Sequence, residues 1–102
     1  MTLTDSLRLV LRQVTSSGTP APMNEILQDY TGASISTSTT VNHLLWMCDQ
    51  IDAMEDPAKA NRWIGWVQGV LWASGWQTLT KQREQVRALV SAKAEKIVGV
   101  KP

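Results

Sequence analysis

Tryptophans gather in one short segment of this 102-residue chain. Four of the five lie between Arg62 and Trp76, in the run Arg-Trp-Ile-Gly-Trp-Val-Gln-Gly-Val-Leu-Trp-Ala-Ser-Gly-Trp. Asp56 before Pro57 is typical of a helix start, because the carboxylate caps free N–H groups and proline suits the first helical position. Gly75 favours a left-handed end. The segment therefore predicts a helix that begins at Pro57 and ends just before Gly75.

Both sides of this helix are apolar when its residues are placed at about 100° intervals around the axis. One side is mostly aliphatic and comprises Trp63, Ile64, Val67, Val70 and Leu71. The opposite side, which we call the Trp/Gly face, comprises Arg62, Gly65, Trp66, Gly69, Trp72, Ala73 and Trp76. A helix that is apolar all round must be covered on both sides, and so short a chain has little left to cover the second. We therefore expect a homo-oligomer, with its interface at Gly65, Gly69, Trp72 and Ala73.

Apolar residues recur at helical spacing through most of the rest of the chain. They predict helices at about Leu3–Val14, Met23–Tyr30 and Thr39–Met54, and a last helix that begins at Thr78 or Thr80. Short connections between such helices favour antiparallel neighbours. We expect an all-α fold, a small antiparallel helical hairpin or bundle of four to five helices in oligomeric form. Residues 1–36 are assigned to an N-terminal helical segment with polar loops and residues 37–102 to the helical-hairpin core.

Charge is distributed unevenly, although the net charge is only +1. Residues 13–58 contain six acidic residues and no Lys or Arg, whereas the segment from residue 77 onward is basic. These two segments can meet within one protomer or across subunits. The longest apolar stretch is far shorter than the roughly 20 residues of a membrane span, so we expect no membrane association. A single cysteine and no leader pattern favour the cytoplasm.

The sequence offers little for catalysis. His43 and Cys48 lie about 140° apart around one helix, too far for a hydrogen bond between a nucleophile and its base. A metal site needs more His, Cys or clustered carboxylates than this chain contains. Neither a phosphate-binding loop nor a dinucleotide fingerprint is present. We expect structural roles for both residues, no enzymatic activity, no metal and no cofactor.

Residues 23–47 can be aligned with a helix-turn-helix, which makes a DNA-binding regulator one alternative. The spacing from Gly32 to Val41 is longer than that motif usually allows, and the second helix carries Asn42 and His43 but no Lys or Arg. Because phosphate neutralisation supplies most DNA affinity, an acidic segment should repel a duplex. Nucleic-acid binding is therefore not the expected function.

The Trp/Gly face is the strongest candidate for a binding surface. It is either an interface only, where Trp and Arg commonly act as anchors, or in part a pocket for an aromatic, phosphate-bearing ligand. In a pocket, Trp66 or Trp76 would stack a base, and Gln68 or Asn61 would contact a polar edge. Phosphates would meet Arg62 and, from the last helix, Arg83 or Arg87.

The chain resembles a family of small accessory proteins encoded by tailed bacteriophages and prophages. The resemblance covers about residues 43–88 and is carried by His43-Leu-Leu-Trp-Met-Cys48, the run Lys59-Ala-Asn-Arg-Trp-Ile-Gly-Trp-Val-Gln-Gly-Val-Leu-Trp72 and Gly75-Trp-Gln-Thr-Leu-Thr80. Family members more often carry Leu at Ile64, Phe at Trp66 and an acidic residue early in the last helix.

This resemblance implies a small non-enzymatic protein that acts in the host cytoplasm, where proteins of this class commonly counter host defence. One recurrent design is a small oligomer that sequesters a nucleotide immune signal, such as a cyclic nucleotide or an ADP-ribose derivative, in pockets between subunits. We expect that function here. The alternative is an inhibitor or adaptor that binds a host protein through the Trp/Gly face or the acidic helix.

Overall fold

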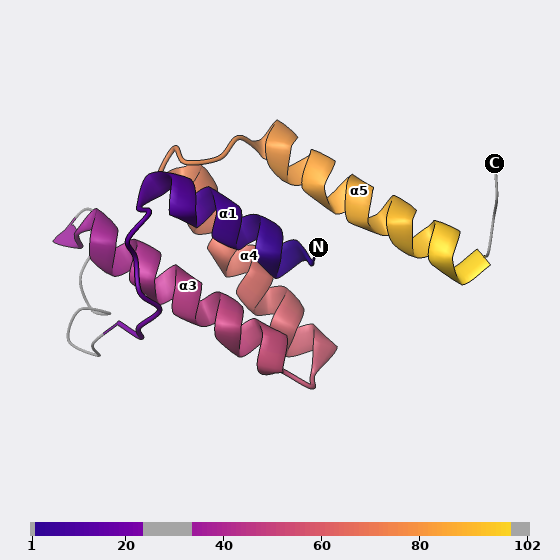
Figure 1. Ribbon diagram of the computed structural model, residues 1–102, viewed down its shortest axis with the longest axis horizontal. Coiled ribbons are helices and arrows are strands. Elements are labelled where there is room, and N and C mark those ends of the chain that lie inside the picture. The colour runs from indigo at the N-terminus through magenta and orange to yellow at the C-terminus, as the bar shows by residue number, and fades with distance from the viewer. Residues whose placement is uncertain (1, 24–33, 99–102) are drawn as a thin grey trace.

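The computed structural model describes residues 2–23 and 34–98, and the side chains of the last helix as far as Ala88. These residues form helices and no strands, which confirms the all-α prediction (Figure 1). The helices are α1 (Leu3–Val14), α3 (Thr37–Ala53), α4 (Pro57–Ala73) and α5 (Leu79–Val98). The short helix predicted at Met23–Tyr30 lies almost wholly outside the described residues.

Capping side chains define where the helices begin. Thr2 and Asp5 form a reciprocal capping box at the start of α1, and the Asp56 carboxylate accepts from the first turn of α4. α3 begins two residues before the predicted Thr39, because the Ser36 side chain accepts from the Thr39 N–H and so caps the polar threonine run. Gly75 has φ 75°, the left-handed conformation that the sequence predicted beyond α4.

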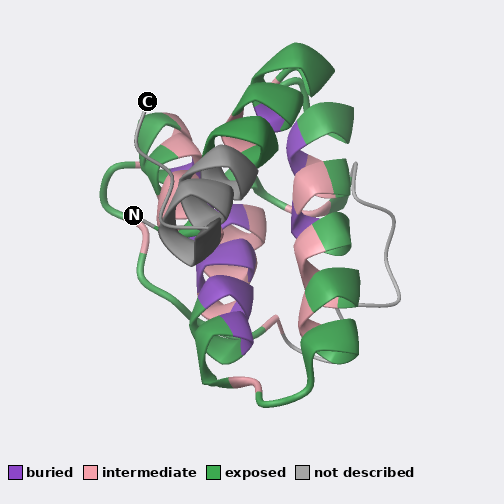
Figure 2. Cartoon of the chain, turned by 90° about the vertical axis from the view of Figure 1, so that its right-hand side faces the viewer, coloured by how far each residue is buried: buried purple, intermediate pink, exposed green. Residues whose placement is uncertain are grey.

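α3 and α4 form an antiparallel hairpin, and α1 packs across both of them (Figure 1). The buried side of each helix faces the other two (Figure 2). The hairpin part of the prediction is thus confirmed. One shared core holds the buried apolar residues Leu7, Leu11, Val41, Leu44, Leu45, Met47, Cys48, Ile51, Val67 and Leu71.

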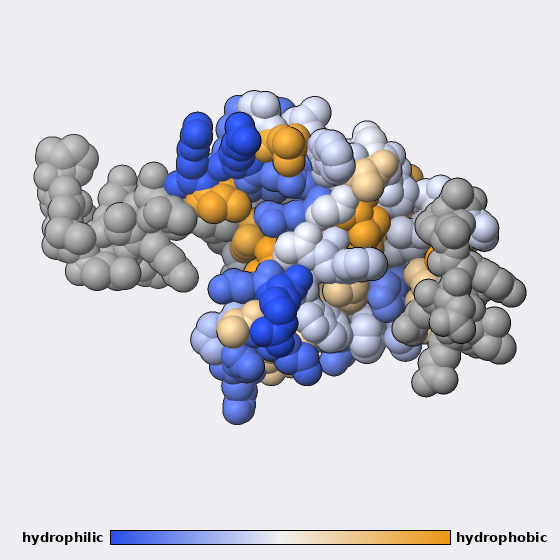
Figure 3. Space-filling model, turned by 180° about the vertical axis from the view of Figure 1, so that it is seen from behind, coloured by the Kyte–Doolittle hydropathy of each residue, from blue (hydrophilic) through white to orange (hydrophobic). Residues whose placement is uncertain are grey.

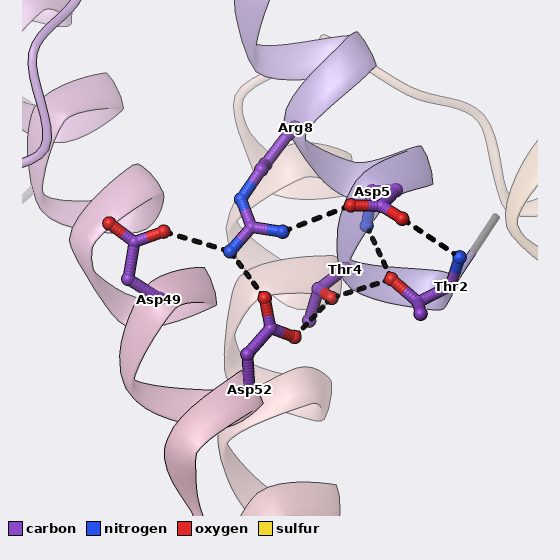
Figure 4. A network of polar contacts seen from close by, with 6 residues as sticks. All are labelled: Thr2, Thr4, Asp5, Arg8, Asp49 and Asp52. Carbon is purple, nitrogen blue, oxygen red and sulfur yellow. Dashed lines mark hydrogen bonds and ion pairs between the residues drawn. The ribbon is translucent and has the colours of Figure 1, made fainter.

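An ion-pair network fastens α1 to α3 at one end of this core (Figure 4). The Arg8 guanidinium donates to Asp49 Oδ1 at 2.8 Å, to Asp52 Oδ2 at 2.6 Å and to Asp5 Oδ1 at 3.2 Å. Thr4, which is buried, donates to Asp52 Oδ1 at 2.5 Å. Burial opposes the charge on Arg8, but the hydrogen bonds to Asp52 and Asp49 outweigh it and raise the pKa of Arg8. The register between α1 and α3 is therefore set by charge as well as by packing.

α5 departs from the rest of the bundle. Its first turns pack near the end of α1, and its remaining length extends away from the other helices (Figure 1). Gln82, which is buried, anchors it by donating from Nε2 to the Gln68 carbonyl at 2.7 Å. Among the described helices, α5 included, none combines the length and apolar character needed to cross a bilayer.

Candidate ligand groove

A groove of about 1270 Å³ runs between α3 and α4. Its lining is mostly apolar and includes four indoles; we call it the tryptophan groove. It is lined by Met23, Ile35, Thr37, Thr40, His43, Leu44, Trp46, Met47, Arg62, Trp63, Trp66, Val70, Ala73, Ser74 and Trp76. None of these described residues is acidic or comes from α1 or α5, so the groove belongs to the α3–α4 hairpin and its flanking segments.

The spacing of residues along α4 explains how the helix serves both the core and the groove. Val67 and Leu71, one turn apart, are completely buried. Trp63, Trp66 and Val70 recur at intervals of three and four residues and so form a neighbouring stripe. This second stripe is rotated away from the core, and it therefore supplies one wall of the tryptophan groove.

Aromatic contacts organise the opposite wall. The His43 imidazole stacks on Trp46 with ring centroids 5.5 Å apart and planes at 27°. The ring centroids of Trp46 and Trp63 are in turn 6.0 Å apart across the groove, and the two ring planes lie at 43°. The Lys59 ammonium is 5.7 Å from the Trp63 ring centre, within range of a cation–π interaction. A chain of rings thus links α3 to α4.

His43 also holds the chain segment that enters the groove. Its Nδ1 accepts a hydrogen bond from the Met23 N–H at 2.9 Å. Burial lowers the pKa of His43 below its ordinary value, so the ring is neutral at pH 7 and can accept this bond. His43 thus holds the Met23 backbone in place, and the structural role predicted for it stays a prediction.

Cys48 lies in the core with no exposed surface. Burial raises the pKa of its thiol to about 11, which leaves almost no thiolate at neutral pH. The prediction of a small buried hydrophobe is confirmed. In the described parts of the chain, no group of three or more His, Cys, Asp and Glu side chains is placed to hold a metal ion.

The groove brings together three of the seven residues predicted to bind a ligand. Arg62, Trp66 and Trp76 line it, whereas Asn61 and Gln68 belong to α4 but are not among its lining residues. Arg83 and Arg87 are exposed on α5, and this helix does not border the groove. Within a single protomer, the predicted phosphate contacts from the last helix are therefore not assembled.

Sequence reasoning missed the contribution of α3 and its neighbours to the groove. Trp46 and Trp63 line it, and neither was predicted as a site residue. The available indication was that Trp46 lies three residues after His43, beside the stripe of core positions on the same helix. Such a position borders a core and reaches the surface, which is where the edge of a groove forms.

Most of the Trp/Gly face is exposed in the protomer. The side chains of Trp66 and Trp72 are 62% and 56% exposed, whereas Trp76 is partly buried against the core. A Cβ added at Gly65 or Gly69 would meet nothing within 4 Å. The described part of the chain thus supplies no cover for these glycines, and their proposed place in an oligomer interface stays a prediction.

Comparisons of this chain with protein-family models, with curated protein sequences and with solved structures found no match.

Proposed function

We propose that this protein is a non-catalytic binding protein that holds a planar, anionic ligand of the nucleotide class in the tryptophan groove. One observation supports this most: four indoles and the Arg62 guanidinium line a single solvent-open groove. Indole faces stack on planar rings such as nucleobases. A guanidinium pairs with phosphate through two parallel hydrogen bonds.

The size and charge of the groove agree with such a ligand. Pockets for small molecules commonly have volumes of about 300–1,000 Å³. The tryptophan groove, at about 1270 Å³, is large enough for a nucleotide with a second ring or sugar. Because its described lining contains no carboxylate, a phosphate near Arg62 would meet no like charge from the groove wall.

The resemblance to phage accessory proteins suggests the biological role. We propose that the protein sequesters a nucleotide immune signal, a cyclic nucleotide or an ADP-ribose derivative, in the host cytoplasm. In this proposal copies associate through Gly65, Gly69, Trp72 and Ala73, and pockets lie where subunits meet. Arg83 and Arg87 then act on phosphate only when the α5 helix of a neighbouring copy reaches the groove.

Calorimetric titration with a panel of cyclic mononucleotides, cyclic dinucleotides and ADP-ribose derivatives tests the proposal. Arg62→Ala should abolish binding and leave the helical circular dichroism unchanged, because this guanidinium is exposed. Lys81→Ala, which removes an equal charge from exposed α5, is the matched control and should bind normally. Trp66→Ala should also weaken binding, since this indole lines the groove. Absence of heat with the whole panel would overturn the proposal.

A second candidate is a protein-binding inhibitor or adaptor. It is favoured by the mainly apolar lining of a groove between two helices, a shape that accepts the apolar side of an amphipathic helix. Capture of one host protein from lysate, lost with Trp66→Ala but not with Trp72→Ala, would favour it over nucleotide binding. DNA binding has no such support, because α3 carries no Lys or Arg.

A further inference from the structure

One side of α5 combines exposed apolar and basic residues. Leu79 and Val86 are 48% and 40% exposed, and Arg83 and Arg87 are exposed as well. At about 100° per residue, these four positions fall within an arc of about 100° and so lie on the same side of the helix. Figure 3 shows hydrophobic and strongly hydrophilic side chains next to one another where α5 leaves the bundle, at the upper left of the view.

The ion pairs of α5 leave this side unneutralised. Lys81 lies on a different side of the helix and pairs with Glu84 at 3.6 Å. No ion pair is found for Arg83 or Arg87 among the side chains that the structure describes. Two guanidinium groups beside exposed apolar surface form a typical anchor for a protein interface.

A surface of opposite charge lies on α3 and the turn after it. Asp49 and Asp52 remain about half exposed even though both accept from Arg8. Glu55 and Asp56 follow in the turn and are exposed. On α1, Asp5 also accepts from Arg8, and the exposed Leu9 lies one turn further on. One arginine thus faces three carboxylates, so the surface has an excess of negative charge.

We infer that α5 of one copy docks on the acidic surface of a second copy of this chain. Charge complementarity identifies the occupant, because the two surfaces are opposite in sign and no described ion pair joins them within a protomer. Each exposed ion pair contributes only about 0–1 kcal/mol, so the contact also requires burial of Leu79 and Val86. A reciprocal exchange of α5 between two copies closes a twofold dimer. This inference does not depend on ligand binding in the tryptophan groove. It is an alternative to association through the Trp/Gly face and to the phosphate role proposed above for Arg83 and Arg87.

Sedimentation equilibrium of the full chain at low and high salt tests the docking. In low salt the mass should approach twice 11.3 kDa, and the monomer should dominate in high salt because screening weakens exposed charge pairs. Arg87→Glu should raise the dissociation constant by about tenfold or more. Lys81→Glu on another side of the same helix is the matched control and should leave the constant nearly unchanged.

A mixing experiment makes the assignment of the two surfaces specific. The double variant Arg83→Glu with Arg87→Glu and the single variant Glu55→Lys should each be monomeric. An equimolar mixture should form a heterodimer, because the unchanged basic side of α5 in the Glu55→Lys variant meets the unchanged acidic surface of the double variant. Circular dichroism should show that both variants remain helical.

Three results would overturn the inference. The first is a wild-type monomer at every concentration in low salt. The second is a dimer whose dissociation constant is unchanged by Arg87→Glu. The third is a dimer lost with Trp72→Ala but indifferent to salt, which would assign self-association to the Trp/Gly face alone.

Discussion

The two sides of α4 contrast within a single helix. On the inner side, Val67 and Leu71 have no exposed surface and contact α1 and α3. On the outer side, Trp66 and Trp72 keep more than half of their surface exposed, with Gly65 and Gly69 beside them. The inner side is aliphatic and closely packed, whereas the outer side combines large rings with positions that have no side chain. The contrast indicates that folding depends on one side and leaves the other free for association or binding.

Adjacent residues on α4 provide the sharpest test of this contrast. Leu71→Ala should lower the free energy of unfolding by about 2–5 kcal/mol, since it opens a cavity in the core. Trp72→Ala, one residue later, should change it by less than about 1 kcal/mol because the indole is mostly exposed. Urea denaturation followed by far-ultraviolet circular dichroism measures both. Equal losses would show that the outer side also contributes to the fold.

The Arg8 network tests whether charge holds α1 on the inner side of the hairpin. Arg8→Met should lower the free energy of unfolding by about 1–2 kcal/mol at pH 7, because three nearby carboxylates lose a shared donor. Lys81→Met, which removes the exposed pair with Glu84, is the control and should have almost no effect. The same urea titration compares the two. If Arg8→Met lowered the free energy of unfolding no more than the control does, packing alone would hold α1 on the hairpin.

The ends of the helices could be predicted from the sequence because they depend on local chemistry. Asp56 before Pro57 acts within one turn, and α4 begins at Pro57 as predicted; α1 likewise begins at the predicted Leu3. The buried side of α4 was also predictable, because helical periodicity alone groups Val67 with Leu71. These features need no knowledge of which helix packs on which.

The candidate site was only partly predictable, because it depends on how helices pair. Trp46 reaches the groove from α3, and its meeting with Trp63 is a tertiary contact that spacing does not encode. Arg83 was assigned to a phosphate by residue type, but its position depends on the direction of α5. That direction is set by the Gly75 turn and by the bond from Gln82 to the Gln68 carbonyl.

Alanine in place of a glycine on the outer side of α4 should change the free energy of unfolding in one direction. The same substitution at a glycine that packs inward should change it in the other. Gly69→Ala should raise the free energy of unfolding by up to about 1 kcal/mol, because the new methyl group meets no neighbour and alanine favours the helix. Gly18→Ala should lower it, since a Cβ there would lie 3.0 Å from Asn42 Oδ1, which holds the Thr19 N–H. If a second copy packs on the Trp/Gly face, Gly69→Ala also weakens self-association, as sedimentation would show. Destabilisation by Gly69→Ala would mean that this part of α4 is covered within the protomer.

His43 lies where the core meets the groove. Of the changes considered, its titration is expected to have the smallest effect on the free energy of unfolding. Burial lowers its pKa in the folded state, so the unfolded chain binds more protons once the pH falls below the ordinary value of 6.5. The free energy of unfolding should therefore fall with pH in that window, and a protonated Nδ1 can no longer accept from the Met23 N–H. Urea midpoints measured from neutral pH to about pH 5 test this, with His43→Gln as the reference because the chain contains one histidine. An equal pH dependence in His43→Gln would assign the effect to carboxylates, whereas a flattened profile would show that the groove wall and the fold share this one side chain.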